Sequence, residues 1–231
     1  MTSPTSSSRD ELAARIAANI AEIDARLLRV GRTRDEVTVV AVTKTHPREV
    51  VQVAYDAGLR IFGENYLEEL VAKSTSTASL SDVQWQFLGA LQSRKIPTLA
   101  HHADVLATIS REKEIVRLAA CDGPVPRVMI QVDFTDAPGR NGARPNDVSH
   151  LVATARRVGL EVEGLMTVAP VDLGEARRAF RELATIAKGE GVRELSMGMS
   201  GDYEVAVSEG ATQIRLGQAL FGPRDPVVAV S

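Results

Sequence analysis

Eight short apolar segments alternate with helical segments along this chain, and this alternation limits its possible folds more than any other feature. The apolar segments are residues 37–43, 60–63, 84–89, 105–109, 127–132, 161–166, 194–197 and 212–216. Helical periodicity is present between them, near residues 47–57, 65–73, 91–100, 111–121, 145–158, 172–189 and 202–209. Short, nearly continuous apolar strands are typical of a parallel sheet that helices cover on both faces.

Eight strand–helix units predict an α/β fold, a closed (β/α)8 TIM barrel that forms one domain over the 231 residues. An open parallel sheet is the alternative, because the number of units alone does not show that the sheet closes. An extra helix precedes the first strand, since apolar residues recur at intervals of three and four from Leu12 to Leu27. Ser8 is the expected N-cap of this helix, Glu11 completes a capping box, and residues 1–7 are expected to be disordered.

Two further segments have the composition of exposed loops. Residues 74–79 consist of serine, threonine and alanine, and residues 136–145 are rich in glycine, proline and polar residues. The second of these loops follows the fifth strand, and we expect both at the surface.

Net charge, cysteine content and histidine spacing exclude several classes of protein. The net charge of −3 gives no general attraction to nucleic acid or to an anionic membrane, and no apolar stretch reaches the roughly 18–20 residues of a membrane span. The polar N-terminal segment lacks the apolar centre of a signal peptide, so we expect a cytoplasmic protein. Cys121 is the only cysteine and is expected to be an inert thiol. The four histidines form no metal-binding pair, so we expect no metal.

Lys44 is the first candidate for chemistry, because it directly follows the first apolar strand. Active sites of parallel barrels lie at the C-terminal ends of the strands. A lysine there is partly desolvated, which favours the neutral, nucleophilic amine and suits attack on an aldehyde. The alternative is a lysine whose side chain simply reaches solvent at the end of a strand.

Two glycine-containing turns are candidates for an anion site. Ser196, Ser200 and Gly201 lie between the seventh strand and the following helix, and Gly217 follows the eighth strand. Free backbone N–H groups at the start of a helix bind anions, and the loops after strands seven and eight are the usual phosphate position in such barrels. Ordinary strand-to-helix turns are the alternative explanation.

Arg215 lies inside the eighth apolar strand, where a charged side chain must be paired or must face a ligand. It could donate to a ring nitrogen, or form a salt bridge with a carboxylate such as Glu64. Glu64 and Asn65 end the second strand at the same rim. An ion pair for Glu64 and an N-cap for Asn65 remain open beside direct contact with a ligand.

These residues lie in segments that resemble one family, the pyridoxal phosphate homeostasis proteins, also called the YggS or PROSC family. The matching segments are residues 39–47, 62–66, 85–95, 164–167, 195–203, 214–217 and 221–222. They follow one another in order from the first strand to the last helix, and together they are highly specific.

The resemblance implies a barrel similar to the N-terminal domain of alanine racemase, with pyridoxal 5′-phosphate held as an internal aldimine, a Schiff base, on Lys44. Ser200 and Gly201 would hold the phosphate together with Gly217, and Arg215 would face the pyridine nitrogen. The full set of cofactor-binding residues that the resemblance implies is Lys44, Asn65, Ser196, Met199, Ser200, Gly201, Arg215 and Gly217.

The chain departs from the family pattern in two places. Where relatives usually read Trp-His-Phe-Ile-Gly-His, Gln86 and Ala90 occupy the two histidine positions, so a role for imidazole near the cofactor does not extend to this chain. In the loop after the fifth strand, Arg140 takes the place of a lysine.

For Asn65, the resemblance implies a position near the cofactor ring or its 3′-oxygen.

The residues and the resemblance together predict a protein that binds, buffers and delivers pyridoxal phosphate, rather than an enzyme. An arginine at the ring nitrogen accepts no proton and keeps that nitrogen neutral, which weakens the cofactor as an electron sink. Alanine racemase tolerates such an arginine but adds a tyrosine base from a second domain, for which the ten residues after Phe221 leave no room. Tyr66 is the one tyrosine expected beside the rim.

The expected partners are pyridoxal phosphate and the apo-enzymes that receive it, with no nucleic acid and no membrane. We expect a monomer, because the domain that completes the alanine racemase dimer is missing. A weak amino-acid racemase is the first alternative function. A cofactor-free barrel enzyme that acts on a phosphorylated sugar is the second.

Overall fold

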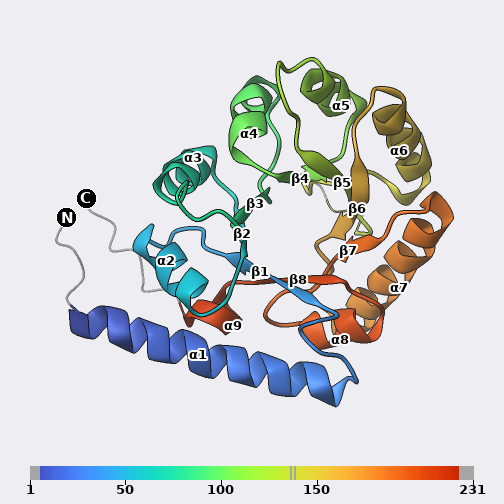
Figure 1. The fold of residues 1–231 in the computed structure, drawn as a ribbon. Helices are drawn as coiled ribbons and strands as arrows, with labels where there is room; N and C mark the ends of the chain where they lie inside the picture. The colour runs from blue at the N-terminus through green and yellow to red at the C-terminus, as the bar shows by residue number, and fades with distance from the viewer. Residues whose placement is uncertain (1–5, 136, 138, 224–231) are drawn as a thin grey trace.

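Eight parallel strands close into a barrel in the computed structural model, which describes residues 6–135, 137 and 139–223 (Figure 1). The strands are β1 (Thr38–Val42), β2 (Ile61–Glu64), β3 (Gln84–Phe87), β4 (Val105–Ile109), β5 (Arg127–Val132), β6 (Val162–Thr167), β7 (Glu194–Ser196) and β8 (Gln213–Leu216). Each strand pairs with its successor, and β8 pairs with β1. The prediction of a closed TIM barrel is confirmed, and the open sheet is excluded because no edge remains unpaired.

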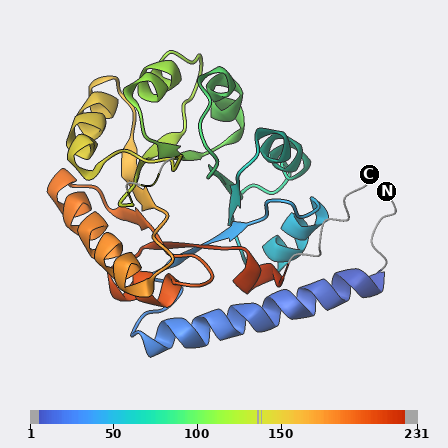
Figure 2. The same cartoon turned by 180° about the vertical axis from the view of Figure 1, so that it is seen from behind.

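Helices form the outer layer of the barrel, and Figures 1 and 2 show α2 to α8 arranged around the strands. The helices are α1 (Ser6–Arg29), α2 (Glu49–Asp56), α3 (Leu67–Ser76), α4 (Ile96–His102), α5 (Glu112–Ala119), α6 (Val148–Arg157), α7 (Leu173–Glu190), α8 (Tyr203–Ser208) and α9 (Gln218–Phe221), with 3-10 turns at Ser93–Lys95 and Pro145–Asp147. None of the helices in the described part of the chain combines the length and apolarity that crossing a membrane requires.

Alternate residues along the strands divide the apolar side chains between two cores. Val105 and Met129 join Ala107 and Met166 in a small cluster inside the barrel. Leu106 belongs instead to the large core between the strands and the helices. Successive side chains of a strand point to opposite faces, so a sheet buried on both faces needs apolar residues at both sets of positions. This explains why the strands read as continuous apolar segments.

Helix α1 covers the part of the barrel that α8 and α9 are too short to cover. It has 24 residues, whereas α8 has 6 and α9 has 4. It lies along α2, α8 and α9 in both views of the ribbon (Figures 1 and 2). Asn19 Nδ2 donates to the Leu220 carbonyl at 2.9 Å. The buried residues of its inner face include Ile16, Ile20, Ile23 and Leu27.

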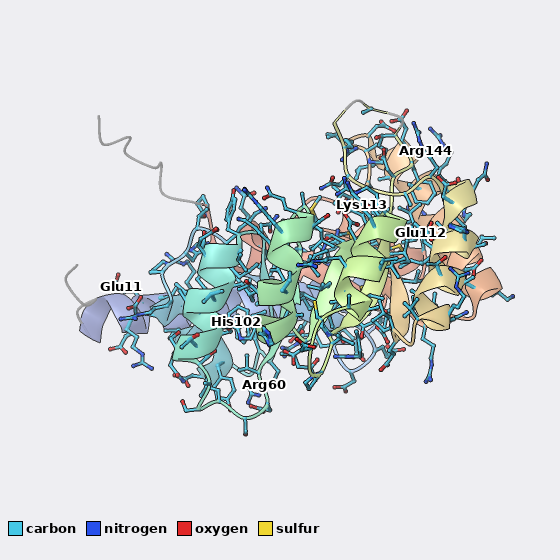
Figure 3. The ribbon with its side chains drawn as sticks, turned by 90° about the horizontal axis from the view of Figure 1, so that it is seen from above. Glu11, Arg60, His102, Glu112, Lys113 and Arg144 are labelled. Atoms are coloured by element: carbon cyan, nitrogen blue, oxygen red, sulfur yellow. The ribbon has the colours of Figure 1, made fainter. Side chains whose placement is uncertain are left out.

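The side view distinguishes the two ends of the barrel (Figure 3). Arg60, just before β2, and His102, at the end of α4, mark the end at which the strands begin. Lys113, near the start of α5, and Arg144, on the loop after β5, mark the end at which the strands finish. All eight strands therefore open onto the same end, where a barrel carries its functional loops.

Three local predictions differ from the structure. Helix α1 begins at Ser6 instead of following an N-cap at Ser8, so residues 6–7 are helical, and residues 1–5 lie outside the described residues. Helix α3 continues to Ser76 through the predicted loop, because the hydroxyls of Ser76 and Thr77 donate to the Lys73 carbonyl and satisfy the end of the helix. Helix α9 is absent from the prediction, since four residues are too few to show a periodicity.

The predicted loop after β5 folds back onto that strand. Ala143 forms an isolated parallel bridge with Val132, and its N–H donates to the Gln131 carbonyl at 2.8 Å. The Asp133 N–H donates to the Ala143 carbonyl at 2.9 Å. Positions 136 and 138 of the loop lie outside the described residues.

Glu163 is a buried carboxylate at the end of the barrel where the strands begin. Its side chain is 7% exposed, and Arg127 Nη1 donates to its Oε2 at 2.6 Å. Its Oε1 atom has no hydrogen-bond partner among the described residues. Burial raises the pKa of Glu163 to about 7; Arg127 opposes this rise, whereas Glu194 and Glu161 add to it.

We predict that Glu163 makes the protein less stable as the pH rises from about 4.5 to about 7. In that range the folded protein keeps a proton on Glu163 that the unfolded chain has released, so a rise in pH favours unfolding. The Glu163→Gln variant lacks this proton linkage and should gain about 1–3 kcal/mol relative to the natural protein between pH 4.5 and 7.5. Denaturant titrations monitored by circular dichroism at a series of pH values measure the difference.

Glu161→Gln is the matched control, because Glu161 lies two residues away at the same end of the barrel but is exposed. Its stability should follow that of the natural protein across the same pH range. A constant difference between Glu163→Gln and the natural protein from pH 4.5 to 7.5 would contradict the assignment to Glu163.

Candidate functional site

A pocket of about 440 Å³ lies at the end of the barrel where the strands finish. This volume is within the range of about 300–1,000 Å³ that is usual for small-molecule sites. The pocket is lined by Val42, Lys44, Asn65, Leu88, Met166, Val168, Met199, Ser200, Gly201, Arg215, Gly217 and Gln218. The predicted cofactor residues therefore meet in one pocket, with the exception of Ser196.

Lys44 lies in a turn directly after β1 and is partly buried. The Thr43 N–H donates to the Gly63 carbonyl at 3.1 Å, which extends the pairing of β1 and β2 up to this turn. Thr45 has a φ of 65°, a left-handed conformation that costs a β-branched residue about 1–3 kcal/mol. The chain thus turns sharply at Lys44, and the lysine side chain lines the pocket.

Arg215 is held in the barrel by oxygen atoms of the two preceding strands. Its Nη1 atom donates to the Ser196 carbonyl at 2.6 Å and to Ser196 Oγ at 3.0 Å, and its Nη2 atom donates to the Thr167 carbonyl at 2.7 Å. The residue is 5% exposed. Burial lowers the pKa of its guanidinium to about 10, and Asp202 opposes this decrease. The group remains cationic at neutral pH and faces the pocket.

Ser196 differs from the prediction in its surroundings. The residue is fully buried within β7, and both of its oxygen atoms accept hydrogen bonds from Arg215. Strand β7 ends at Ser196, so this residue belongs to the strand and precedes the glycine-containing turn. In this structure it positions Arg215 and does not line the pocket.

The two predicted anion-binding turns meet at the pocket. Ser200 Oγ accepts a hydrogen bond at 3.0 Å from the N–H of Ala219, which lies in the first turn of α9. The N–H groups of Leu220 and Phe221 donate to the Gly217 carbonyl. The loops after β7 and β8 are thereby fixed against each other. Ser200 and Gly201 from the first loop and Gly217 and Gln218 from the second loop line the pocket side by side.

The space available for a Cβ atom differs between Gly198 and Gly201. A Cβ on Gly198 would lie 2.7 Å from the Cβ of Ala206, and the residue has a φ of 93°, so the fold itself requires glycine there. A Cβ on Gly201 would meet no protein atom within 4 Å. Gly201 also lines the pocket, so the fold leaves room for a side chain there that the sequence does not fill.

Asn65 is seated by a close backbone contact rather than by capping a helix. The N-cap residue of helix α3 is Tyr66, so the interpretation of Asn65 as an N-cap is wrong. The Tyr66 side chain is 53% exposed. A Cβ on Gly89 would lie 2.0 Å from the Asn65 carbonyl oxygen. Glycine at position 89 therefore allows the segment after β3 to approach Asn65, which lines the pocket.

Glu64 pairs with Lys73 and not with Arg215, the partner considered in the sequence analysis. Lys73 Nζ lies 2.6 Å from Glu64 Oε1, and Thr43 Oγ1 donates to the same oxygen at 2.6 Å. Burial raises the pKa of Glu64 above its ordinary value, although both donors oppose this rise. Sequence reasoning missed Lys73, for which the only signal was its spacing of four residues from Glu69 on α3.

Apolar side chains form the walls of the pocket and were also missing from the prediction. They are Val42, Leu88, Met166 and Val168. Each lies at or just beyond the end of its strand, so position in a TIM barrel was the signal that could have found them. An apolar wall with a few polar groups is the usual composition of a site for a small planar ligand.

Comparison with known proteins identifies the family. The model of the alanine racemase N-terminal domain matches residues 13–225. A pyridoxal phosphate homeostasis protein of Pseudomonas aeruginosa is 37% identical over 222 residues, which cover 91% of this chain and 96% of that protein. The protein of the same name from Escherichia coli K12 is 36% identical over 228 residues, covering 91% and 97% of the two chains. The chain belongs to the pyridoxal phosphate homeostasis protein family.

Solved structures agree with this assignment. PipY of Synechococcus elongatus PCC7942 with bound PLP matches with a TM-score of 0.77 and 33% identity, over 90% of this chain and all of that one (100%). Alanine racemase of Corynebacterium glutamicum, at 19% identity, shares the fold with a TM-score of 0.72, over 95% of this chain and 64% of that one.

Gln86, Ala90 and Arg140, the departures from the expected family pattern, lie away from the pocket lining. Gln86 is buried in the barrel, where its Nε2 atom donates to Gln213 Oε1 at 3.1 Å. Ala90 is exposed. Arg140, on the loop after β5, donates to the Ala169 carbonyl at 3.4 Å. In this member of the family, the side chains at these three positions do not line the pocket.

We predict that alanine substitutions at the two glycines have different effects on stability. Gly198→Ala should lower the free energy of unfolding by about 1–3 kcal/mol, because its Cβ collides with α8 and its φ is positive. Gly201→Ala should change it by less than about 0.5 kcal/mol, because its Cβ enters open space. Chemical denaturation monitored by circular dichroism measures both. An equal loss in the two variants would show that the fold, not a ligand, requires Gly201.

Proposed function

We propose that this protein binds pyridoxal 5′-phosphate through Lys44 and serves to buffer and deliver it, without efficient turnover of its own. The observation that carries the proposal is a single pocket that joins the Lys44 side chain, the buried Arg215 guanidinium and the open space beside Gly201. The names of the relatives from Pseudomonas aeruginosa and Escherichia coli, and the PipY structure with bound PLP, support it.

The residues of the pocket fit the chemical groups of this cofactor. Pyridoxal phosphate supplies an aldehyde, with which a lysine amine forms a C=N bond and releases one water. Lys44 supplies the amine in our proposal, and Ser200, Gly201 and Gly217 surround the phosphate. Val42 and the other apolar side chains that line the pocket would contact the ring and exclude water from it.

Arg215 is our reason for proposing a carrier and not an enzyme. Its guanidinium only donates hydrogen bonds, and at a pKa of about 10 it stays charged at neutral pH. Facing the ring nitrogen, such a cation disfavours protonation of that nitrogen. Stabilisation of a carbanion depends on this protonation, so the site binds the cofactor without making it a strong electron sink.

The biological setting is part of the same proposal. We infer that a single barrel domain acts in the cytoplasm as a monomer and that apo-enzymes dependent on pyridoxal phosphate receive the cofactor. The net charge of −3 agrees with a partner that is neither nucleic acid nor an anionic membrane.

We predict that Lys44→Ala abolishes covalent attachment of the cofactor. The natural protein, incubated with pyridoxal phosphate, should develop a visible absorption band that borohydride removes, and peptide mass mapping should then find the phosphopyridoxyl group on Lys44. In Lys44→Ala the band should be absent, and affinity should fall at least about tenfold because the covalent bond is lost.

Lys113→Ala is the matched control, because Lys113 is an exposed lysine at the same end of the barrel (Figure 3). This variant should keep the band and the modification at Lys44. A natural protein that stays colourless in excess pyridoxal phosphate would overturn the proposal and favour a cofactor-free barrel enzyme acting on a phosphorylated sugar.

We further predict that the loaded protein does not racemise amino acids efficiently. Its rate with L-alanine should lie within about tenfold of the rate with free pyridoxal phosphate, a difference in barrier of only about 1.4 kcal/mol. Chiral chromatography measures this rate. In a parallel assay, the loaded protein should restore activity to a purified apo-enzyme. Fast, stereospecific racemisation that Lys44→Ala removes would instead establish the racemase alternative.

A further inference from the structure

A connected group of hydrogen bonds joins the turn that carries Lys44 to helix α3. It consists of Thr43, Glu64, Glu69 and Lys73, and we call these residues the Lys73 cluster. Lys73 Nζ donates to the Thr43 carbonyl at 2.8 Å, to Glu64 Oε1 at 2.6 Å and to Glu69 Oε2 at 2.7 Å. An ammonium group has three N–H donors, so these three oxygen atoms use all of them.

The cluster holds the chain on both sides of Lys44. On the N-terminal side, Thr43 is fixed through its carbonyl by Lys73 and through its hydroxyl by Glu64. On the C-terminal side, the Thr45 N–H donates to Glu69 Oε2 at 2.8 Å. One carboxylate oxygen of Glu69 therefore links Thr45 to Lys73, and the turn is tied to helix α3 at both of its ends.

Thr45 needs such a contact because its conformation is unfavourable. Its φ of 65° is rare for a β-branched residue, and such conformations persist only where the surroundings impose them. The hydrogen bond from Thr45 to Glu69 is one of these constraints. The next residue, His46, packs against α9, because the centroid of its ring lies 5.0 Å from the ring centroid of Phe221. The turn is thus held between α3 and α9.

The cost of the cluster indicates a role beyond stability. Lys73 and Glu64 are 3% and 0% exposed, and a buried ion pair recovers its desolvation cost only with excellent geometry. An apolar pair of similar size usually gives equal or greater stability. It would, however, leave the Thr43 carbonyl and hydroxyl without their partners, and it would remove the Lys73 ammonium that Glu69 accepts from while holding the Thr45 N–H.

We propose that the Lys73 cluster is a positioning device that fixes the direction in which Lys44 enters the pocket. This inference rests on the proposed function, in which Lys44 is the residue that bonds the cofactor. The direction of a side chain follows from the backbone at its own residue and its neighbours. Without the contacts to Thr43 and Thr45, the turn relaxes to a negative φ at Thr45, and the Lys44 amine is displaced from the aldehyde.

Two neighbouring carboxylates on α3 make this inference testable. Glu69 holds the turn, whereas Glu68 pairs at 2.9 Å with Lys95 and is 73% exposed. Glu69→Ala should slow formation of the borohydride-stable adduct on Lys44 about tenfold or more, because small misplacements of a reacting group have large effects on rate. Glu68→Ala should leave this rate unchanged. Glu69→Gln should restore most of it, because the amide oxygen can still accept from Thr45.

A second measurement needs no cofactor. Amide hydrogen exchange should show faster exchange at Thr45 in Glu69→Ala than in the natural protein or Glu68→Ala. Glu69→Ala should remain folded, because Lys73 keeps its bonds to Glu64 and to the Thr43 carbonyl, and circular dichroism checks this. Lys73→Met removes the ammonium group itself and should slow adduct formation in the same way.

The outcomes separate the two proposals. Adduct formation in Glu69→Ala at the natural rate, with unchanged exchange at Thr45, would overturn the positioning role and leave the proposed function intact. Equal slowing of adduct formation in Glu68→Ala would also overturn the positioning role, because any loss of negative charge from α3 would then be enough to slow the reaction. Failure of the natural protein to form an adduct on Lys44 would refute the proposed function, and exchange at Thr45 would still decide whether Glu69 holds the turn.

Discussion

The pairing of β8 with β1 is the constraint on which the rest of the molecule depends. Its register places Val40 opposite Arg215 and Ala41 opposite Leu216. Continued by one residue, the same register places Val42 opposite Gly217, where a Cβ would lie 3.4 Å from the Val42 carbonyl oxygen. Lys44 follows two residues after Val42. The closure that removes the sheet edges therefore also joins the lysine to the two turns that the sequence predicts to bind an anion, although more than 150 residues separate them.

Most of the fold could be predicted from the sequence, because barrel strands carry their signal in local composition. Strands β4 and β5 have the predicted bounds, since both of their faces are apolar and their ends are sharp. The failures have local causes. Ser76 and Thr77 lie at the end of a helix because their hydroxyls satisfy the Lys73 carbonyl, an arrangement that composition does not distinguish from a loop. Helix α9 is too short to have a periodicity.

The site could be predicted only as far as position along the strands determines it. Lys44, Gly201 and Gly217 line the pocket because each follows a strand, and that much is visible in a sequence. The partner of a buried charge is not visible in the same way. Arg215 is held by carbonyl oxygens and a hydroxyl, and Glu64 pairs with Lys73 from the next helix. Such pairings depend on distances between elements, which a single sequence does not contain.

Both ends of the barrel bury charged side chains, but the buried cations lie around the pocket. At the end where the strands begin, one oxygen of Glu163 has no partner among the described residues, and burial raises its pKa. At the other end, Lys73 uses all three of its donors, and Arg215 donates to three oxygen atoms of the neighbouring strands. The Lys73 cluster is not fully satisfied either, because Glu64 Oε2 also has no partner among the described residues. What distinguishes the end with the pocket is that its buried cations, Lys73 and Arg215, donate to several oxygen atoms each, which fixes their positions beside the amine that bonds the cofactor in our proposal.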